Sequence, residues 1–537
     1  MNLCIALKTV FYGGRHPLTY DEHQEITKKH KQLLEKYRKN TRDEFLKLES
    51  QTLDANDIFA ESNIVKAKKF GDYVFKKSKD CSDGLLNISK SIIESCVENL
   101  EHANISAPCK FAVIGLGSIA TGVATPYSDL EFGFIIEQES QYFEKLAVES
   151  YFRIGNLGET SLKHFNIDEL KGDQVLCNRN FKVGFRIDGI TSKAGNIPTG
   201  NGIDVTKTLT LTVDGVMQLY KEAAEEKFSG IAGDKSDMLS SSVLIYTNEQ
   251  SSSQLYELFS KKRANYERNK GANSRVVEKK RYDSFVLDIN SFSFLPEFTN
   301  FRPSQNLSIQ VKTDIFRYPT LLANNIKMCS GLETQYPWDT FHRLYEEKTL
   351  SYENYRYICI VLALSIYIRT SAYLDQQSKT ESVTLKTDQS STARLQYIVP
   401  HNLFVILGCL LTHLKRSINN FILRHTADST SLGEFVSKMV QSIYISQNNL
   451  LPKVEVYYFC GRYDDALECL GKILEVSATT IGRSELVQRI QQYYKVHSSP
   501  TYPTNKSSNL TASEDHLIEL GAYLLYYTKI YTSCKIF

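Results

Sequence analysis

The sequence predicts an α+β fold in which a small mixed sheet is embedded in a largely helical chain. Two observations lead to this expectation. Short apolar runs that end at glycine or turn residues cluster between about residues 108 and 250, and such runs are typical of buried strands. The stretches on either side instead show apolar residues at the spacing of amphipathic helices.

Length and composition set the scale of the fold. The 537 residues are enough for about three or four domains. Hydrophobic residues make up 42% and charged residues 23%, which excludes disordered, collagen-like and membrane-embedded chains. The net charge of +2 does not favour a nucleic-acid partner. Changes in texture divide the chain into an N-terminal helical region (1–107), a strand-containing domain (108–300), a helical domain (301–400) and a C-terminal helical region (401–537).

Cysteine, histidine and hydropathy patterns bear on location. The eleven cysteines include no Cys-x-x-Cys pair, which predicts reduced thiols and a cytoplasmic protein. The sequence contains no His-Glu-x-x-His motif, so a metal site built from histidines has no support. The first residues lack the basic leader and cleavage site of a signal peptide. The longest apolar run, Ile358–Ile368, is too short for a bilayer and predicts a buried core helix, so no membrane association is expected.

The N-terminal region, from about residue 19 to 106, is predicted to be helical. Thr19 and Glu22 have the spacing of a capping box, which marks a helix start. Apolar residues then recur at helical spacing, most clearly from Leu85 to Leu100. The Lys- and Glu-rich faces between them predict a solvated outer side.

The strand-containing domain begins at Lys110, where the texture changes. Strands and helices are expected to alternate, as in an α/β or α+β segment. Strands are predicted at 111–114, 130–136, 181–190, 209–213 and 243–246, and helices at 141–154 and 213–226.

The rest of the chain is predicted to be helical with two polar loops. Helices are expected over 318–374 and 402–425, and a Ser/Thr-rich loop or linker over 376–394. Residues 454–474 resemble one tetratricopeptide repeat, with a tight turn at Gly461-Arg462-Tyr463. Because stable arrays usually need about three copies, a plain helical hairpin is an equal alternative.

The stretch from Gly115 to Ile136 contains residues that are suited to binding phosphate groups and a metal ion. Gly117 and Ser118 follow a strand, where a glycine lets the backbone approach phosphates and a serine donates hydrogen bonds to them. Asp129 and Glu131 open the next strand, and residues two apart in a strand share a face. Two neighbouring carboxylates suit Mg²⁺, which in turn binds a nucleoside triphosphate.

This pattern resembles the signature of the polymerase-β-type nucleotidyltransferase superfamily: Gly-Ser, about ten residues, then two acids separated by one apolar residue. The segment Ala-Thr-Pro-Tyr-Ser-Asp-Leu-Glu is most similar to a branch related to bacterial PII-protein uridylyltransferases. The resemblance implies a third acid on a later strand, and Asp188 is the best match. It extends weakly to Lys312–Pro319, which looks like the entrance to a helical substrate-binding domain, and so covers about residues 90–375.

The resemblance implies a metal-dependent transferase. Asp129, Glu131 and Asp188 would hold Mg²⁺ (or Mn²⁺), Gly117 and Ser118 would bind the nucleotide, and a nucleoside monophosphate such as UMP would pass to a protein. That protein acceptor or partner would bind through the C-terminal helices. Two departures stand out. Thr121 occupies a position where many relatives have Arg, and Glu131 replaces the commoner aspartate.

Two alternatives remain open at this stage. The first is a catalytically inactive nucleotide sensor or interaction scaffold, which Thr121 and Glu131 favour slightly, and the second is transfer to a small molecule or an RNA end. Nine basic residues between Lys261 and Arg281 suggest either a solvated helix and loop or a surface for triphosphate, RNA or an acidic protein. Asp129 alone is compatible with a turn residue and Asp188 with a surface ion pair.

Overall fold

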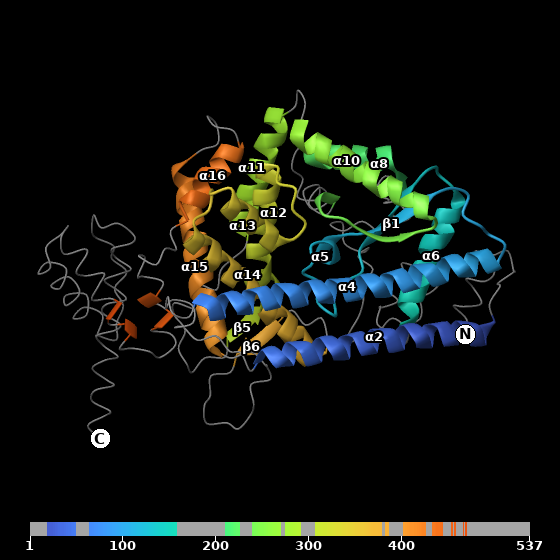
Figure 1. The fold of residues 1–537 in the computed structure, drawn as a ribbon, viewed down its shortest axis with the longest axis horizontal. Coiled ribbons are helices and arrows are strands. Elements are labelled where there is room, and N and C mark those ends of the chain that lie inside the picture. Colours follow the sequence, from blue (N-terminus) through green and yellow to red (C-terminus); the bar gives the residue numbers. More distant parts are fainter. Residues whose placement is uncertain are drawn as a thin grey trace, which may run out of the picture.

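The structure is a computed structural model of a mostly helical protein with a small mixed sheet, which confirms the α+β prediction at that level (Figure 1). It describes residues 19–49, 64–157, 210–225, 239–269, 274–291, 307–377, 382–385, 401–425, 432–443, 453–454, 456–457, 465–466 and 468–469.

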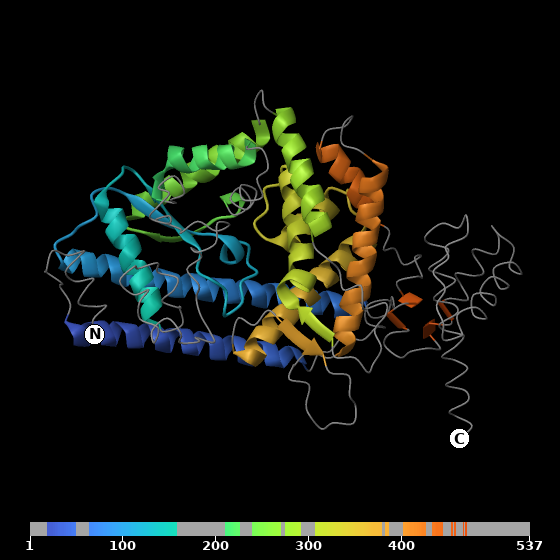
Figure 2. The same ribbon diagram turned by 180° about the vertical axis from the view of Figure 1, so that it is seen from behind.

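Two long helices, α2 (Tyr20–Glu49) and α4 (Ile64–His102), lie side by side along one side of the molecule (Figures 1 and 2). The predicted capping box begins α2: the Thr19 N–H donates to the Glu22 carboxylate at 2.7 Å, and the Glu22 N–H donates to Thr19 Oγ1 at 3.3 Å. The Tyr37 hydroxyl donates to the Cys81 carbonyl at 2.9 Å, which joins the two helices near their middle.

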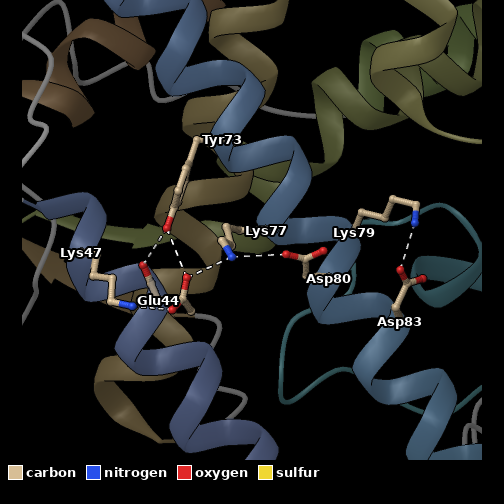
Figure 3. Close-up of polar contacts among 7 residues, drawn as sticks. All are labelled: Glu44, Lys47, Tyr73, Lys77, Lys79, Asp80 and Asp83. Atoms are coloured by element: carbon tan, nitrogen blue, oxygen red, sulfur yellow. Dashed lines mark hydrogen bonds and ion pairs between the residues drawn. The ribbon is translucent and has the colours of Figure 1, made fainter.

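A polar cluster joins α2 and α4 further along (Figure 3). Glu44 of α2 pairs with Lys77 of α4 at 2.9 Å, and the Tyr73 hydroxyl donates to the Glu44 carbonyl at 3.4 Å. Because Tyr37 meets Cys81 whereas Glu44 meets Lys77, the helices run antiparallel. Hydrogen bonds from Lys47 and then Lys77 lower the pKa of Glu44 to about 2. Partly exposed pairs of this kind each add little stability, so the apolar contacts between the helices matter more.

The four-stranded sheet has the order β3-β2-β1-β4. β1 pairs antiparallel with both β2 and β4, whereas β2 pairs parallel with β3, so the sheet is mixed as predicted. The strands are β1 (Phe111–Gly115), β2 (Phe132–Ile136), β3 (Thr210–Thr212) and β4 (Val243–Thr247).

Helices cover both faces of the sheet. Side chains of a strand alternate between its faces, and on one face they pack against α4 and α6: Phe111, Val113, Phe132, Phe134 and Ile136. On the other face, Ile114 and Ile135 pack against α8 and α10. The helices of this domain are α5 (Gly117–Ala120), α6 (Gln141–Asn156), α8 (Val213–Glu225), the 3₁₀ turn η5 (Gln250–Ser252) and α10 (Ser253–Asn269). The next helix, α11 (Ser274–Ser291), buries Phe285 and Ile289 in the second core described below.

The second group of helices lies beside the sheet domain and above the ends of α2 and α4 (Figure 1). Its core includes Phe45 of α2 and Phe70 of α4, so the two long helices contribute to both cores. The elements are β5 (Leu307–Gln310), the π-helical η7 (Val311–Phe316), α12 (Arg317–Ser330), α13 (Pro337–Glu346), α14 (Tyr352–Gln376), β6 (Ser382–Leu385), α15 (His401–Arg424) and α16 (Leu432–Gln441).

Helix α14 is long and apolar enough to cross a membrane, yet 94% of its most apolar window is buried inside the protein. It contains Ile358–Ile368, the run predicted as a core helix. α14 packs against α4, α13 and α15, which surround it. Helix α14 therefore forms the centre of the second core.

Two predictions about strands were inexact or wrong. Residues 376–394 were expected to be a loop or linker, but Ser382–Leu385 form β6 and pair antiparallel with Leu307–Gln310. β2 begins at Phe132, two residues after the predicted start, so Asp129 and Glu131 lie just before the strand. The strand predicted at 181–190, with Asp188, and most of the tetratricopeptide-like unit at 454–474 lie outside the described residues.

A buried polar cluster joins α2, α4 and α6. Glu149 accepts a hydrogen bond from Asn99 at 2.7 Å and another from Arg153 at 3.1 Å, and Arg153 is 1% exposed. His30 of α2 is 2% exposed in the same region. Burial, together with the nearby positive charge of Arg153, lowers the pKa of His30 to about 4. His30 is therefore neutral in the folded protein at pH 7.

This titration predicts that the protein loses stability in mild acid. The unfolded chain binds a proton at His30 below about pH 6.5, whereas the folded chain does so only near pH 4, so stability is full above pH 6.5 and falls between these values. The shift corresponds to about 3 kcal/mol. Urea unfolding at pH 7 and pH 5 should show a smaller loss for His30→Gln than for the wild type. Equal losses in the two proteins would contradict this role of His30.

Candidate functional site

Three chain segments meet at one edge of the sheet. Gly115 at the end of β1 pairs with Phe132 at the start of β2 and with Val243 at the start of β4. The residues after β1 and those before β2 and β4 therefore leave the sheet at the same edge. This register places Gly117 and Ser118 beside the segment that contains Asp129 and Glu131.

Glu131 lies against the backbone of Gly117. The Leu116 N–H donates to the Glu131 carbonyl at 2.9 Å, which fixes the two segments to each other. Gly117 has a φ of +60°, in the left-handed region that favours glycine. A Cβ at this position would overlap the Glu131 carboxylate. The site therefore requires glycine both for its backbone conformation and for the space that the carboxylate occupies.

The predicted site residues are partly exposed among buried neighbours. Gly117, Ser118, Asp129 and Glu131 are all partly exposed, whereas Leu130 is only 7% exposed. The alternation over 129–131 is that of an extended segment, in which residues two apart share a face. The structure thus brings Gly117 and Glu131 into contact and leaves both acids accessible to a ligand. It does not place Asp188, which lies outside the described residues.

Thr121 closes the short helix α5. Its hydroxyl donates to the carbonyl of Gly117 at 3.1 Å, and its N–H donates to the same carbonyl at 3.1 Å. Thr121 therefore stabilises the turn that begins with Gly117 and Ser118. It contributes no charge to the site.

Side chains from four parts of the chain donate hydrogen bonds to the connection from Ala120 to Ser128. Residues 122–128 are all buried, and a buried backbone needs hydrogen-bond partners. Side chains of α2, α4, α14 and the segment before α13 donate to its carbonyls. The pairs are Arg38 to Pro126 at 3.1 Å, Ser78 to Gly122 at 2.7 Å, Arg369 to Val123 at 3.4 Å and Gln335 to Ala120 at 3.2 Å.

An aromatic stack packs against the same connection at Gly122. Tyr336 and Trp338 stack with ring centroids 5.0 Å apart, and Trp338 stacks on Phe75 of α4 at 4.9 Å. Gly122 has a φ of +71°, and a Cβ there would come within 2.6 Å of the Tyr336 ring. Partial burial raises the pKa of Tyr336. The stack therefore fixes the far end of α5 against the helical group.

Asp129 and Glu131 fit a divalent cation as a pair of hard oxygen ligands. Mg²⁺ is commonly bound by one or two carboxylates and completes its shell with water and substrate phosphates. Among the described residues, no group of three His, Cys, Asp or Glu side chains is arranged to hold a metal. A metal held by this pair alone would take the rest of its ligands from water or substrate, and Asp188 stays a prediction for a third ligand.

Several residues of the basic run between residues 261 and 281 make contacts within the protein, some buried and some at the surface. Arg281 binds both carboxylate oxygens of Glu267, at 2.8 and 2.7 Å, and also the Met328 carbonyl. Lys262 pairs with Asp214, and Arg268 pairs with Glu333. These contacts give part of the run a structural role, and a role in binding triphosphate, RNA or an acidic protein stays a prediction.

Sequence analysis missed the residues that hold the site from a distance. Ser78 and Ser82 are two serines one helical turn apart in α4, and Ser82 accepts from the Ala124 N–H at 3.1 Å. Two serines at this spacing lie on the same face of a helix, and that face is otherwise buried. This was the sequence signal that could have identified them. A second signal was the run Ser240–Ser242 immediately before a predicted strand, at the same edge of the sheet.

No protein-family model matches this chain, and no curated protein matches it at a significant level.

Proposed function

We propose that the protein is a metal-dependent nucleotidyltransferase that moves a nucleoside monophosphate from a nucleoside triphosphate to a protein. One observation supports this most strongly: the pairing of β1 with β2 brings Gly117, Ser118, Asp129 and Glu131 to one edge of the sheet, where all four are partly exposed. The resemblance to PII-protein uridylyltransferases suggests UMP as the transferred group. The protein acceptor is proposed to bind through the C-terminal helices.

In the proposed reaction, an acceptor oxygen attacks the α-phosphorus of the triphosphate. The bond from that phosphorus to the oxygen bridging to the β-phosphate breaks, and pyrophosphate leaves. Asp129 and Glu131 would hold Mg²⁺ or Mn²⁺, which neutralises charge on the phosphates when bound. Ser118 would donate hydrogen bonds to a phosphate at the Gly117 turn. Asp188 is proposed as a third metal ligand and as the base that takes the proton from the attacking oxygen of the acceptor protein.

A cytoplasmic location is part of the proposal. Every cysteine in the described part of the chain is a free thiol. Reduced thiols are typical of cytosolic proteins.

A transfer assay tests this function. The purified full chain is incubated with each labelled ribonucleoside triphosphate, Mg²⁺ or Mn²⁺, and a heat-treated cell lysate as acceptor. Label should appear on a protease-sensitive acceptor with the wild type, and not with Asp129→Asn/Glu131→Gln or without enzyme. Label that survives the double substitution would contradict the proposed site, and label resistant to protease would point to RNA or a small molecule as acceptor.

The alternative is an inactive nucleotide sensor or interaction scaffold, and one contact favours it. The Glu131 carboxylate occupies the space above Gly117, where a phosphate would approach, and Thr121 supplies no positive charge. Metal-dependent nucleotide binding without any transfer would support this alternative. Binding of a protein partner that is unchanged by the double substitution would support the scaffold.

A further inference from the structure

A serine turn lies at the same edge of the sheet as the two acids. Ser240, Ser241 and Ser242 immediately precede β4, whose first residue, Val243, pairs with Gly115. Each of the three serines is 5% exposed. Leu116, which follows Gly115, belongs to the same apolar cluster as Leu239 at the start of the turn. The turn is therefore adjacent to the segment that leads into Gly117 and Ser118.

Two cationic side chains from different helices hold this turn. Lys327 of α12 donates to Ser241 Oγ at 2.7 Å and to the Ser240 carbonyl at 3.3 Å. Arg263 of α10 donates to Ser242 Oγ at 3.3 Å and to the Leu239 carbonyl at 2.7 Å. Lys327 is 8% exposed, so its charge lies in a largely desolvated place.

The charges at this edge are arranged in two groups. The segment before β2 contributes the carboxylates of Asp129 and Glu131, and the turn before β4 gathers the cations of Lys327 and Arg263. A metal–triphosphate complex has the matching order of charge, because the cation needs carboxylates and the phosphates beyond it need positive groups. A desolvated ammonium also attracts an anion more strongly than one in water does.

We propose that Ser240–Ser242, Lys327 and Arg263 form the binding site for the terminal phosphates of the nucleoside triphosphate. This inference rests on the proposed function, and it adds the residues that select a triphosphate over a monophosphate. Lys327 supplies charge and hydrogen bonds to the phosphates, and Ser241 positions its ammonium group. Arg263 fixes the other end of the turn and adds a second charge.

Binding measurements with Mg²⁺ and inorganic tripolyphosphate test this site without any dependence on the base. Lys327→Met keeps a similar side-chain volume and should weaken binding about 10- to 100-fold, the usual range for a charge-assisted hydrogen bond. Ser241→Ala should weaken it by a smaller factor. The matched control is Lys262→Met on α10, a lysine one residue from Arg263 that pairs with Asp214, and it should leave binding within about twofold.

The two proposals fail in different ways. If tripolyphosphate binds equally well to the wild type, Lys327→Met and Ser241→Ala, or does not bind the wild type, the phosphate site is wrong. If binding depends on Lys327 but no monophosphate transfer occurs, the phosphate site stands and the transferase function fails. Thermal unfolding of each variant checks its fold, and Ser241→Ala decides the question if Lys327→Met is unfolded. Affinity for UMP should change little in every variant, since it lacks the terminal phosphates.

Discussion

Replacing Glu131 with Gln should lower nucleotide transfer at least about 1,000-fold, because the amide keeps the size of the side chain but loses the charge that would hold the metal. Glu131→Asp keeps the charge but withdraws the carboxylate by one methylene, so it should retain intermediate activity. Neither change removes apolar contacts, and both variants should unfold within a few degrees of the wild type. Initial rates at saturating triphosphate and Mg²⁺ measure the effect.

The matched control for this prediction is Glu137→Gln. Glu137 follows the opposite end of β2 and is exposed, and its carboxylate accepts a hydrogen bond from the Lys110 N–H at 3.3 Å. Removing its charge should leave transfer unchanged. Equal losses in the Glu131 and Glu137 variants would show that general charge, and not the site, sets the rate. Full activity in Glu131→Gln would remove Glu131 from the proposed metal site.

The edge that contains the two acids was predictable because its contacts are local. β1 and β2 are adjacent in the chain and pair antiparallel, so the residues after Gly115 and those before Phe132 must lie together. Glycine, serine and an acid–apolar–acid pattern at those two places are visible within about twenty residues of sequence. The start of β2 was placed two residues early because Asp129–Glu131 is extended without being paired in the sheet.

The supports of the site were not predictable because they come from distant parts of the chain. Arg369 reaches Val123 across 246 residues, and Gln335 reaches Ala120 across 215. Local patterns identify buried helices but do not say which loop a polar side chain in them will contact. The same limit explains why β6 was taken for a loop: its partner, β5, lies about 75 residues earlier. Ser-Val-Thr-Leu does alternate polar and apolar residues as a strand does, but four residues are the minimum for that pattern and they lie in a Ser/Thr-rich stretch.

Replacing Gly117 with Ala should cost somewhat more in the free energy of unfolding than the about 1–2 kcal/mol of a left-handed backbone alone, because the Glu131 carboxylate must also move away from the added Cβ. The left-handed backbone costs a residue with a Cβ about 1–2 kcal/mol, and the overlap with the Glu131 carboxylate adds to it. Gly331, at the C-terminal end of α12, is the control that separates the backbone penalty from the overlap penalty. It has a φ of +65° but nothing within 4 Å of an added Cβ, so Gly331→Ala should show the backbone cost alone. Urea unfolding of the full chain measures both.

A double substitution then tests whether the Glu131 carboxylate causes the part of the Gly117→Ala cost that exceeds the Gly331→Ala cost. In a Glu131→Ala background, the cost of Gly117→Ala should fall to that of Gly331→Ala, since the carboxylate is no longer there. An unchanged cost would show that the Glu131 carboxylate adds nothing to the penalty at Gly117, and the contact would lose this support. A cost that falls as expected would establish the contact independently of any activity. The contact would then hold for a transferase and for an inactive sensor alike, and only the transfer assay would separate them.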